Sequence, residues 1–196
     1  MKKTAVMLLI LTFGLVAVDA QATVWKQDPV HSQVKFGVTH LVISEVDGNF
    51  KDFDVTLSQL NPDFSGSTLE ANIKTASIST DNDMRDKHLR SDDFLNAEKF
   101  PSITFKSTSF EKTGDNEFKI SGNLTIRDVT KPVVLTAKFM GELTDARGVT
   151  KAGFKATGSI SRFDYGVKWN KAVEAGGLVV SDKVDITLLM EMQKQK

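Results

Sequence analysis

Few side chains in this 196-residue sequence have the types and spacing that chemistry requires. There are three histidines, His31, His40 and His88, and no cysteine. A zinc site would need histidines and carboxylates gathered on one face of the fold. His31 and His40 fall on opposite parities of what reads as one continuous strand, so their side chains should point to opposite sides. This spacing disfavours a shared metal, and we expect no metal site.

The acidic stretch that begins at Asp81 has the wrong pattern for a calcium loop. A loop starting there would have Arg85 at its fifth position and Asp86 where glycine is needed. Asp92 would stand where a bidentate glutamate belongs. We therefore expect no calcium ion in this stretch.

The same stretch holds residues of the kind used in acid–base catalysis. Asp86 and His88 lie close in sequence to Arg85 and Arg90, a combination able to move protons. Ion pairs and caps on a helix surface explain these residues more simply. The sequence has no glycine-rich phosphate loop, no Gly-x-Ser-x-Gly elbow and no glutamate-flanked histidine pair. We expect no catalytic residues and no cofactor, and we predict that the protein is not an enzyme.

The charged segment from Asp81 to Asn96 is predicted to be helical. Thr80 followed by Asp83 is a helix-entry pattern, because a hydroxyl at the cap accepts from a free amide while an acid lies at the positive helix end. Ser91 can cap a second short turn, so one helix and two brief helices both remain open. Pro101 ends the segment, because the residue before a proline is pushed out of helical geometry.

Alternation of apolar and polar residues, which is typical of strands, fills the chain on both sides of this segment. The alternating stretches are residues 30–40, 46–57, 69–74, 103–105, 118–126, 133–139, 152–160 and 184–190. The phase slips between Phe50 and Phe53, which predicts a β-bulge near Lys51 or Asp52. About eight strands joined mostly by short turns predict an all-β fold, an antiparallel barrel with a short helical insert.

The interior of a closed barrel of this size is either filled by side chains or holds one small elongated ligand. Small residues among the phenylalanines of the inward faces favour a cavity. They are Gly48, Ala71, Gly122, Ala137, Ala156 and Gly158. The other interpretation is that the glycines mark corners where the strands bend and nothing binds.

The N-terminus has the pattern of a secretory signal peptide. Lys2 and Lys3 precede an apolar run over residues 5–18, and the small residues Ala20 and Ala22 suit a signal peptidase. The run is too short for a stable membrane anchor, and no cysteine follows it for lipid attachment. We predict a signal peptide at residues 1–22 and an exported domain at residues 23–196.

The composition limits the partners and the forces that hold the fold. The chain has 25 basic and 25 acidic residues, which argues against nucleic acid because nucleic acids select basic surfaces. Without cysteine, an exported fold is held by burial rather than by disulfides. The 13 phenylalanines, against one tyrosine and two tryptophans, indicate an apolar interior.

Several segments resemble the YceI-like family, in order and along nearly the whole exported domain. They are residues 28–40, which open with Asp28-Pro29-Val30-His31-Ser32, and residues 48–54, 85–95, 100–101, 122–126, 129–132 and 152–154. The family pattern commonly has glycine where this chain has Asp128. We expect Asp128 in a turn, where aspartate serves as well as glycine.

This resemblance implies a lipocalin-like barrel in the bacterial periplasm that holds a polyisoprenoid or a similar long-chain isoprenoid or acyl lipid. It also implies a binding protein without established catalysis, and a possible homodimer. Burying hydrocarbon yields roughly 0.8 kcal/mol per methylene, while association costs on the order of 4 to 15 kcal/mol. A ligand held by apolar walls must therefore be long, on the order of a dozen or more carbons.

We assign the cavity wall to inward-facing residues of the predicted strands, each of which is equally explicable as plain core. They are Phe36, Val38, Phe50, Phe105, Leu124, Ile126, Leu135, Phe154 and Leu188. His40, at the end of its strand, could meet a polar head group at the barrel mouth, or could simply bond to the backbone.

Two other functions remain open. A barrel packed solid with side chains would serve a structural or stress-protective role without a ligand, and the cavity volume would distinguish it. An isoprenoid-modifying enzyme is the third candidate, although the motifs for one are missing.

Overall fold

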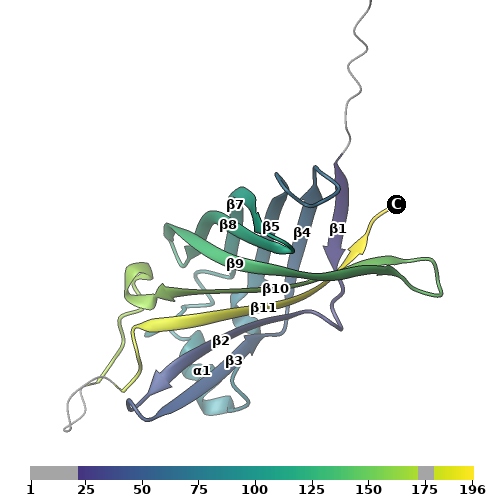
Figure 1. Cartoon of the computed structure of the whole chain (residues 1–196). Helices are drawn as coiled ribbons and strands as arrows, with labels where there is room; N and C mark the ends of the chain where they lie inside the picture. The colour runs from purple at the N-terminus through teal and green to yellow at the C-terminus, as the bar shows by residue number, and fades with distance from the viewer. Residues whose placement is uncertain (1–21, 172–178) are drawn as a thin grey trace, which may run out of the picture.

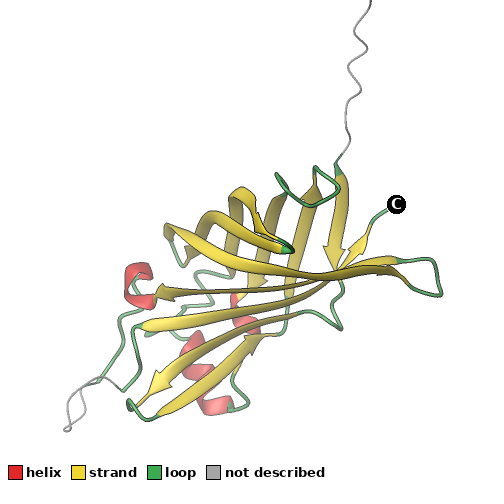
Figure 2. Ribbon diagram, in the orientation of Figure 1, coloured by secondary structure: helices red, strands yellow, loops and turns green. Residues whose placement is uncertain are grey.

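The computed structural model describes residues 22–171 and 179–196. Apart from Ala22, the predicted signal peptide lies outside the described residues. The elements, shown in Figures 1 and 2, are β1 (Thr23–Gln27), β2 (Gln33–His40), β3 (Ser44–Phe50), β4 (Phe53–Gln59), β5 (Thr68–Lys74), the 3-10 turn η1 (Thr75–Ser77), β6 (Ile78–Ser79), α1 (Asp83–Arg90), β7 (Ser102–Gly114), β8 (Glu117–Ile126), β9 (Val129–Thr144), β10 (Thr150–Ser161), the 3-10 turn η2 (Arg162–Tyr165) and β11 (Lys183–Lys194).

Eight strands close into a barrel because the first of them pairs on both sides. The ring runs β1-β4-β5-β7-β8-β9-β10-β11, and β1 closes it by placing Trp25 opposite Leu57 of β4 and opposite Lys194 of β11. All of these pairs are antiparallel. Closure leaves no free edge in the ring. The prediction of an all-β antiparallel barrel of about eight strands with a short helical insert is confirmed.

Three further strands extend the wall beyond the ring. β2 pairs with residues 185–189 of β11, whereas β1 pairs with residues 192–194 of the same strand. β1 and β2 therefore act together as one interrupted strand. β3 pairs with β2 and with the short β6, and in Figure 1 the β2–β3 hairpin leaves the ring beside α1.

The β-bulge predicted near Lys51 or Asp52 is wrong. β3 ends at Phe50 and β4 begins at Phe53, and the two strands pair with different neighbours. The amides of Lys51 and Asp52 donate to the main-chain oxygen and the hydroxyl of Ser77, each at 3.1 Å. The phase slips because the chain changes partners here, not because a strand carries an extra residue.

The first predicted strand begins later than its alternation indicated. Val30, expected on the inward face, is 78% exposed, and it lies with His31 in the turn that joins β1 to β2. β2 begins only at Gln33 and carries His40 at its end. The two histidines therefore do not share a strand.

Helix α1 is capped by a different residue from the one predicted. Asn82 is the N-cap, and its Oδ1 accepts from the amide of Arg85 at 3.0 Å. Thr80 instead donates its amide and its hydroxyl to the buried carboxylate of Asp86, at 2.8 and 2.5 Å. That carboxylate satisfies two buried donors at once. Ser91 ends the helix and turns follow it, so the insert holds one helix rather than two.

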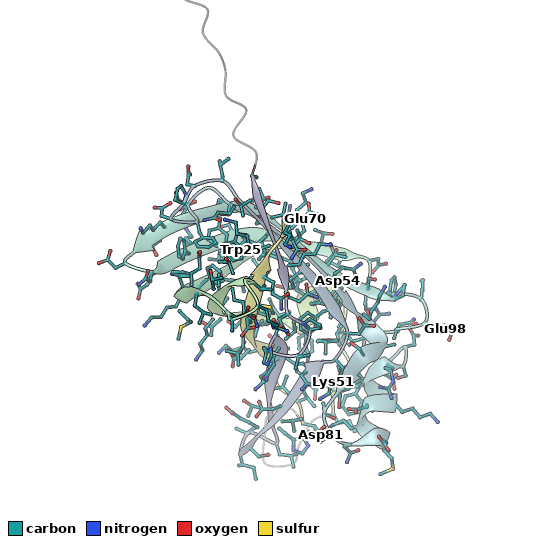
Figure 3. The ribbon with its side chains drawn as sticks, turned by 90° about the vertical axis from the view of Figure 1, so that its right-hand side faces the viewer. Trp25, Lys51, Asp54, Glu70, Asp81 and Glu98 are labelled. Carbon is teal, nitrogen blue, oxygen red and sulfur yellow. The ribbon has the colours of Figure 1, made fainter. Side chains whose placement is uncertain are left out.

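Phe64, from the loop between β4 and β5, fills one end of the barrel. Its ring is 3% exposed and lies 5.1 to 5.7 Å, centroid to centroid, from the rings of Trp25, Phe139 and Phe154. These rings come from β1, β9 and β10, so Phe64 reaches across the interior. Figure 3 shows Trp25 at this end of the molecule and Asp81 of the insert at the other. Within the described part of the chain, no helix is both long and apolar enough to span a membrane.

Candidate functional site: an apolar cavity in the barrel

A cavity of about 450 Å³ lies inside the barrel. Its walls are almost entirely apolar and come from every strand except β1. The volume falls in the range of about 300 to 1,000 Å³ that is typical of ligand pockets. The interior is therefore not packed solid, and it suits an apolar ligand.

All ten side chains that we expected to contact a ligand line this cavity. They are Phe36, Val38 and His40 on β2, Phe50 on β3, Phe105 on β7, Leu124 and Ile126 on β8, Leu135 on β9, Phe154 on β10 and Leu188 on β11. Their contact with a ligand stays a prediction.

Two of the small residues noted in the sequence make room for aromatic rings of the wall. A Cβ atom at Gly48 would lie 2.3 Å from Cζ of Phe36, and one at Gly122 would lie 2.3 Å from Cζ of Phe105. Both rings line the cavity. These glycines shape the wall by letting the rings lie flat across the neighbouring strand.

The insert and the segment after β10 also contribute to the wall. Their lining residues are Thr80, Arg85, His88, Leu89, Phe94, Leu95, Arg162, Tyr165, Val167 and Trp169. These residues were not assigned to the wall from the sequence, because neither segment alternates with period two. The one available signal was Trp169, one of only two tryptophans in a chain rich in phenylalanine.

Three rings from these two segments form a cluster. The ring of His88 lies 4.9 Å from that of Phe94 and 5.1 Å from that of Trp169, and Phe94 and Trp169 are 5.1 Å apart. His88 Nε2 is also 2.8 Å from Oδ2 of Asp93. The ring packing holds the insert against the segment after β10, while the contact of His88 with Asp93 lies within the insert.

The ionisable groups on the described lining, tyrosine aside, are all basic: Lys35, His40, Arg85, His88 and Arg162. Arg162 is buried and donates to the main-chain oxygens of Val167, Trp169, Val180 and Ser181 at 2.7 to 3.0 Å. Burial lowers the pKa of this guanidinium. Because its donors are taken up by the backbone, Arg162 ties residues 167–169 to residues 180–181.

Tyr165 is the most buried polar group of the wall. Burial raises the pKa of its hydroxyl to about 12, so the phenol stays neutral at physiological pH. No hydrogen-bond partner for this hydroxyl occurs among the described residues. Its ring serves as apolar wall.

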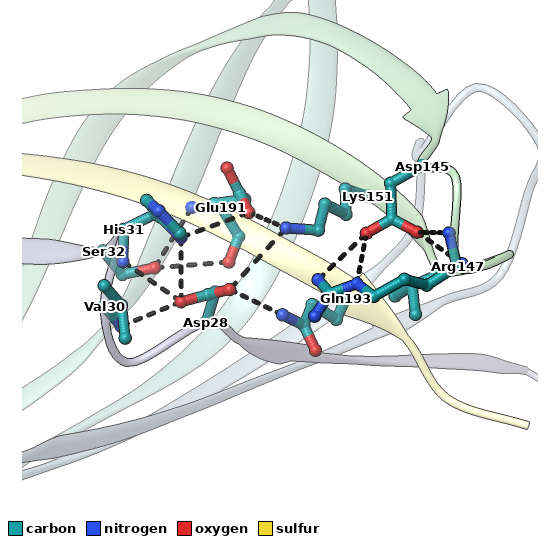
Figure 4. Close-up of polar contacts among 10 residues, drawn as sticks. Asp28, Val30, His31, Ser32, Asp145, Arg147, Lys151, Glu191 and Gln193 are labelled. Carbon is teal, nitrogen blue, oxygen red and sulfur yellow. Dashed lines mark hydrogen bonds and ion pairs between the residues drawn. The ribbon is translucent and has the colours of Figure 1, made fainter.

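A second polar cluster lies where β11 changes partner from β1 to β2, and Figure 4 shows it in close-up. Ligand atoms of Asp28, His31 and Glu191 all lie within 4.8 Å of one another, a spacing able to hold a metal ion. The ammonium group of Lys151 already provides the cation, at 2.5 Å from Glu191 Oε1 and 3.7 Å from Asp28 Oδ2. We therefore interpret this Asp28 cluster as an ionic clasp between strands.

Asp28 is the centre of the clasp. Its carboxylate accepts from the amides of Val30 and His31 at 2.8 and 3.1 Å, and from Gln193 Nε2 at 2.6 Å. Burial on its own would raise the pKa of this carboxyl, but the hydrogen bonds from Val30 and His31 outweigh it and hold the pKa at about 2. The ionised side chain fastens the turn that interrupts the first strand.

A closed antiparallel barrel around an apolar chamber, lined with basic groups, defines a class of proteins built to enclose one apolar molecule. The family model for the YceI-like domain matches residues 25–192. The chain belongs to the YceI-like family.

Relatives and solved structures agree with this assignment. The chain is 40% identical over 200 residues to Protein YceI of Escherichia coli O6:H1, covering 100% of both. It is similar to the crystal structure of the Campylobacter jejuni YCEI protein, with 34% identity, a TM-score of 0.70, and coverage of 81% of this chain and 90% of that one. A polyisoprenoid binding domain from Saccharophagus degradans, implicated in plant cell wall breakdown, matches at a TM-score of 0.63 and 14% identity, covering 87% of this chain and 98% of that one. At that identity the match shows the fold alone.

Proposed function

We propose that this protein is a periplasmic binding protein that holds a long-chain isoprenoid or acyl lipid in its barrel, as a carrier or a store. The apolar cavity of about 450 Å³ carries the proposal. Such walls recognise hydrocarbon length rather than polar detail. Among the basic lining residues, Lys35 and His40 are the groups left to meet an oxygen-bearing head group, because Arg85, His88 and Arg162 are engaged with other protein groups. The predicted signal peptide supports the location, and the fold shared with a polyisoprenoid binding domain supports the ligand class.

Binding without catalysis is the simplest use of this site. The buried polar groups beside the cavity are engaged in structure: Arg162 with main-chain oxygens, and Thr80 with Asp86. His88 lines the cavity but is paired with Asp93, and both side chains are partly exposed.

The direct test is native mass spectrometry of protein purified from a bacterial periplasm without detergent, followed by solvent extraction. We expect a stoichiometric long-chain isoprenoid or acyl lipid. A clean ligand-free mass, together with failure to take up added polyprenyl lipids, would contradict the proposal.

A pair of variants on β5 makes the test specific to the cavity. Ala71 lines the cavity, whereas Asn72 beside it is exposed on the outer face. Ala71→Phe should fill part of the chamber and reduce bound lipid severalfold, while Asn72→Phe should leave lipid content unchanged. Equal lipid content in both folded variants would show that the lipid does not bind in the cavity.

A further inference from the structure

The loop between β2 and β3 presents three apolar residues to solvent. Leu41, Val42 and Ile43 are 40%, 64% and 86% exposed. Tight turns usually carry glycine, asparagine or aspartate, as the β7–β8 turn does at Asp115 and Asn116. Exposed branched side chains at a hairpin tip do not serve solubility, so their presence here needs another reason.

The backbone of this tip is also unfavourable for its side chains. Leu41 and Val42 have φ angles of 50° and 66°, in the left-handed region that β-branched residues rarely adopt. The conformation is held by bonds from the amide of Leu41 to the oxygen of Val179, at 2.9 Å, and from the amide of Ile43 to the oxygen of His40, at 3.2 Å. Strain that persists against the residue type is often found at functional sites.

The tip lies beside the cavity and continues its apolar surface. His40 before it and Val46 after it both line the cavity. So do Val179, which accepts from the amide of Leu41 in the tip, and Val180, which pairs with His40. Figures 1 and 3 place the β2–β3 hairpin and the Asp81 end of the insert at the same end of the molecule. Met84, in the first turn of α1, is 83% exposed. Arg85 lines the cavity and is itself exposed, so the cavity reaches the surface at this end, among exposed apolar side chains.

The charges near the tip select the kind of surface that it meets. Glu45 and Asp47 follow it on β3, and Asp81 and Asp83 lie at the start of the insert. The basic groups of the region are Arg85 and Lys87 on α1 and Lys171, whose main-chain oxygen accepts from the amide of Val179 next to the tip. This mixture gives no positive patch to attract an anionic surface. Contact must then come from apolar insertion into the interfacial layer, which binds with little dependence on salt.

We propose that the tip formed by Leu41, Val42 and Ile43 inserts into a zwitterionic phospholipid membrane and brings the cavity mouth against it. A long-chain lipid then passes between bilayer and barrel without crossing water. This inference rests on the proposed lipid-binding function, because it supplies the route by which the cavity fills.

The test compares two double variants in flotation with phosphatidylcholine vesicles. Val42→Asn with Ile43→Ser removes the apolar tip and places at position 42 a residue that tolerates the left-handed region. Met140→Ser with Leu143→Ser on β9 is the matched control, because these side chains are 64% and 61% exposed but lie on the hairpin at the other end of the barrel. We expect the tip variant to lose tenfold or more in vesicle partitioning, and the control to lose less than twofold.

Three further readouts separate the possible outcomes. The tip variant should keep the wild-type affinity for lipid already bound in the cavity but take lipid from vesicles at least tenfold more slowly. Its melting temperature should equal or exceed that of the wild type; a marked fall would show that the tip serves folding and would overturn the proposal.

Two results of the flotation experiment would also overturn the proposal. One is an equal loss of vesicle partitioning in the tip variant and the control variant, and the other is binding only to anionic vesicles that is abolished by salt. If the wild type binds lipid but no vesicle, the membrane contact fails while the lipid-binding function stands.

Discussion

At the scale of single residues, the ionisation of Asp28 is the clearest link between sequence and stability. Its pKa falls from 3.8 to about 2 on folding, so the native state stabilises the charged form. That contribution is complete above about pH 4 and is lost as the pH falls toward 2, and it amounts to about 2 kcal/mol at neutral pH. The free energy of unfolding, measured by urea denaturation between pH 2 and 7, should therefore decrease as the pH is lowered from about 4 toward 2.

The variant Asp28→Asn separates this effect from general acid sensitivity. The asparagine keeps the shape of the side chain but lacks the negative charge that accepts hydrogen bonds from the turn. The free energy of unfolding should therefore be about 2 kcal/mol lower at pH 7 and should decrease less steeply as the pH is lowered toward 2. Asp115→Asn, at an exposed turn, is the control and should change neither. An unchanged acid limb in Asp28→Asn would show that other carboxyls govern acid unfolding.

Residue identity within the site was predictable where the chain alternates. Phe105, Leu124 and Leu135 were assigned to the wall because strand parity decides which face a side chain takes. Phe94, Tyr165 and Trp169 were missed because they come from turns, where no period relates sequence position to direction. Tertiary packing alone brings these rings to the cavity.

At the scale of elements, the loop between β4 and β5 closes one end of the barrel through a single side chain. Phe64→Ala should lower the free energy of unfolding by about 3 to 5 kcal/mol, because the ring is buried and packs on three others. Chemical denaturation measures this loss. Leu60→Ala in the same loop, where the side chain is 55% exposed, should cost less than about 0.5 kcal/mol. Similar losses in the two variants would contradict the role of Phe64 as the plug.

Elements were predictable in type but not in their partners. The alternation marked most of the strands, yet it missed β1, it began at residue 30 inside the turn that precedes β2, and it suggested a bulge at Lys51 and Asp52. In both places the chain passes from one hydrogen-bonding neighbour to another. Periodicity reports which face is buried, whereas pairing depends on residues far along the chain, so these interruptions could not be seen in one sequence.

At the scale of the whole molecule, the barrel joins a plugged end, an apolar chamber and an end framed by the insert. Each strand of the closed ring has its main-chain groups hydrogen-bonded to a neighbour on both sides. The walls are therefore held in place even though the chamber between them is not filled. A cavity forfeits packing contacts that a solid core would make. An apolar chain that enters restores those contacts, so binding and stability should be coupled.

This coupling predicts how stability depends on the length of the bound chain. Lipid-free protein given prenyl alcohols of increasing length should melt at increasing temperature, because each buried methylene adds roughly 0.8 kcal/mol before the costs of association. A ligand at 100 times its Kd stabilises the folded state by about 2.7 kcal/mol, which thermal unfolding resolves easily. The increase should stop at the length that fills the cavity, and in Ala71→Phe it should stop at a shorter chain while Asn72→Phe follows the wild type. A melting temperature independent of chain length would mean that the chain stays outside the barrel. Only a chain enclosed in the chamber would stop adding stability at the length that fills the chamber.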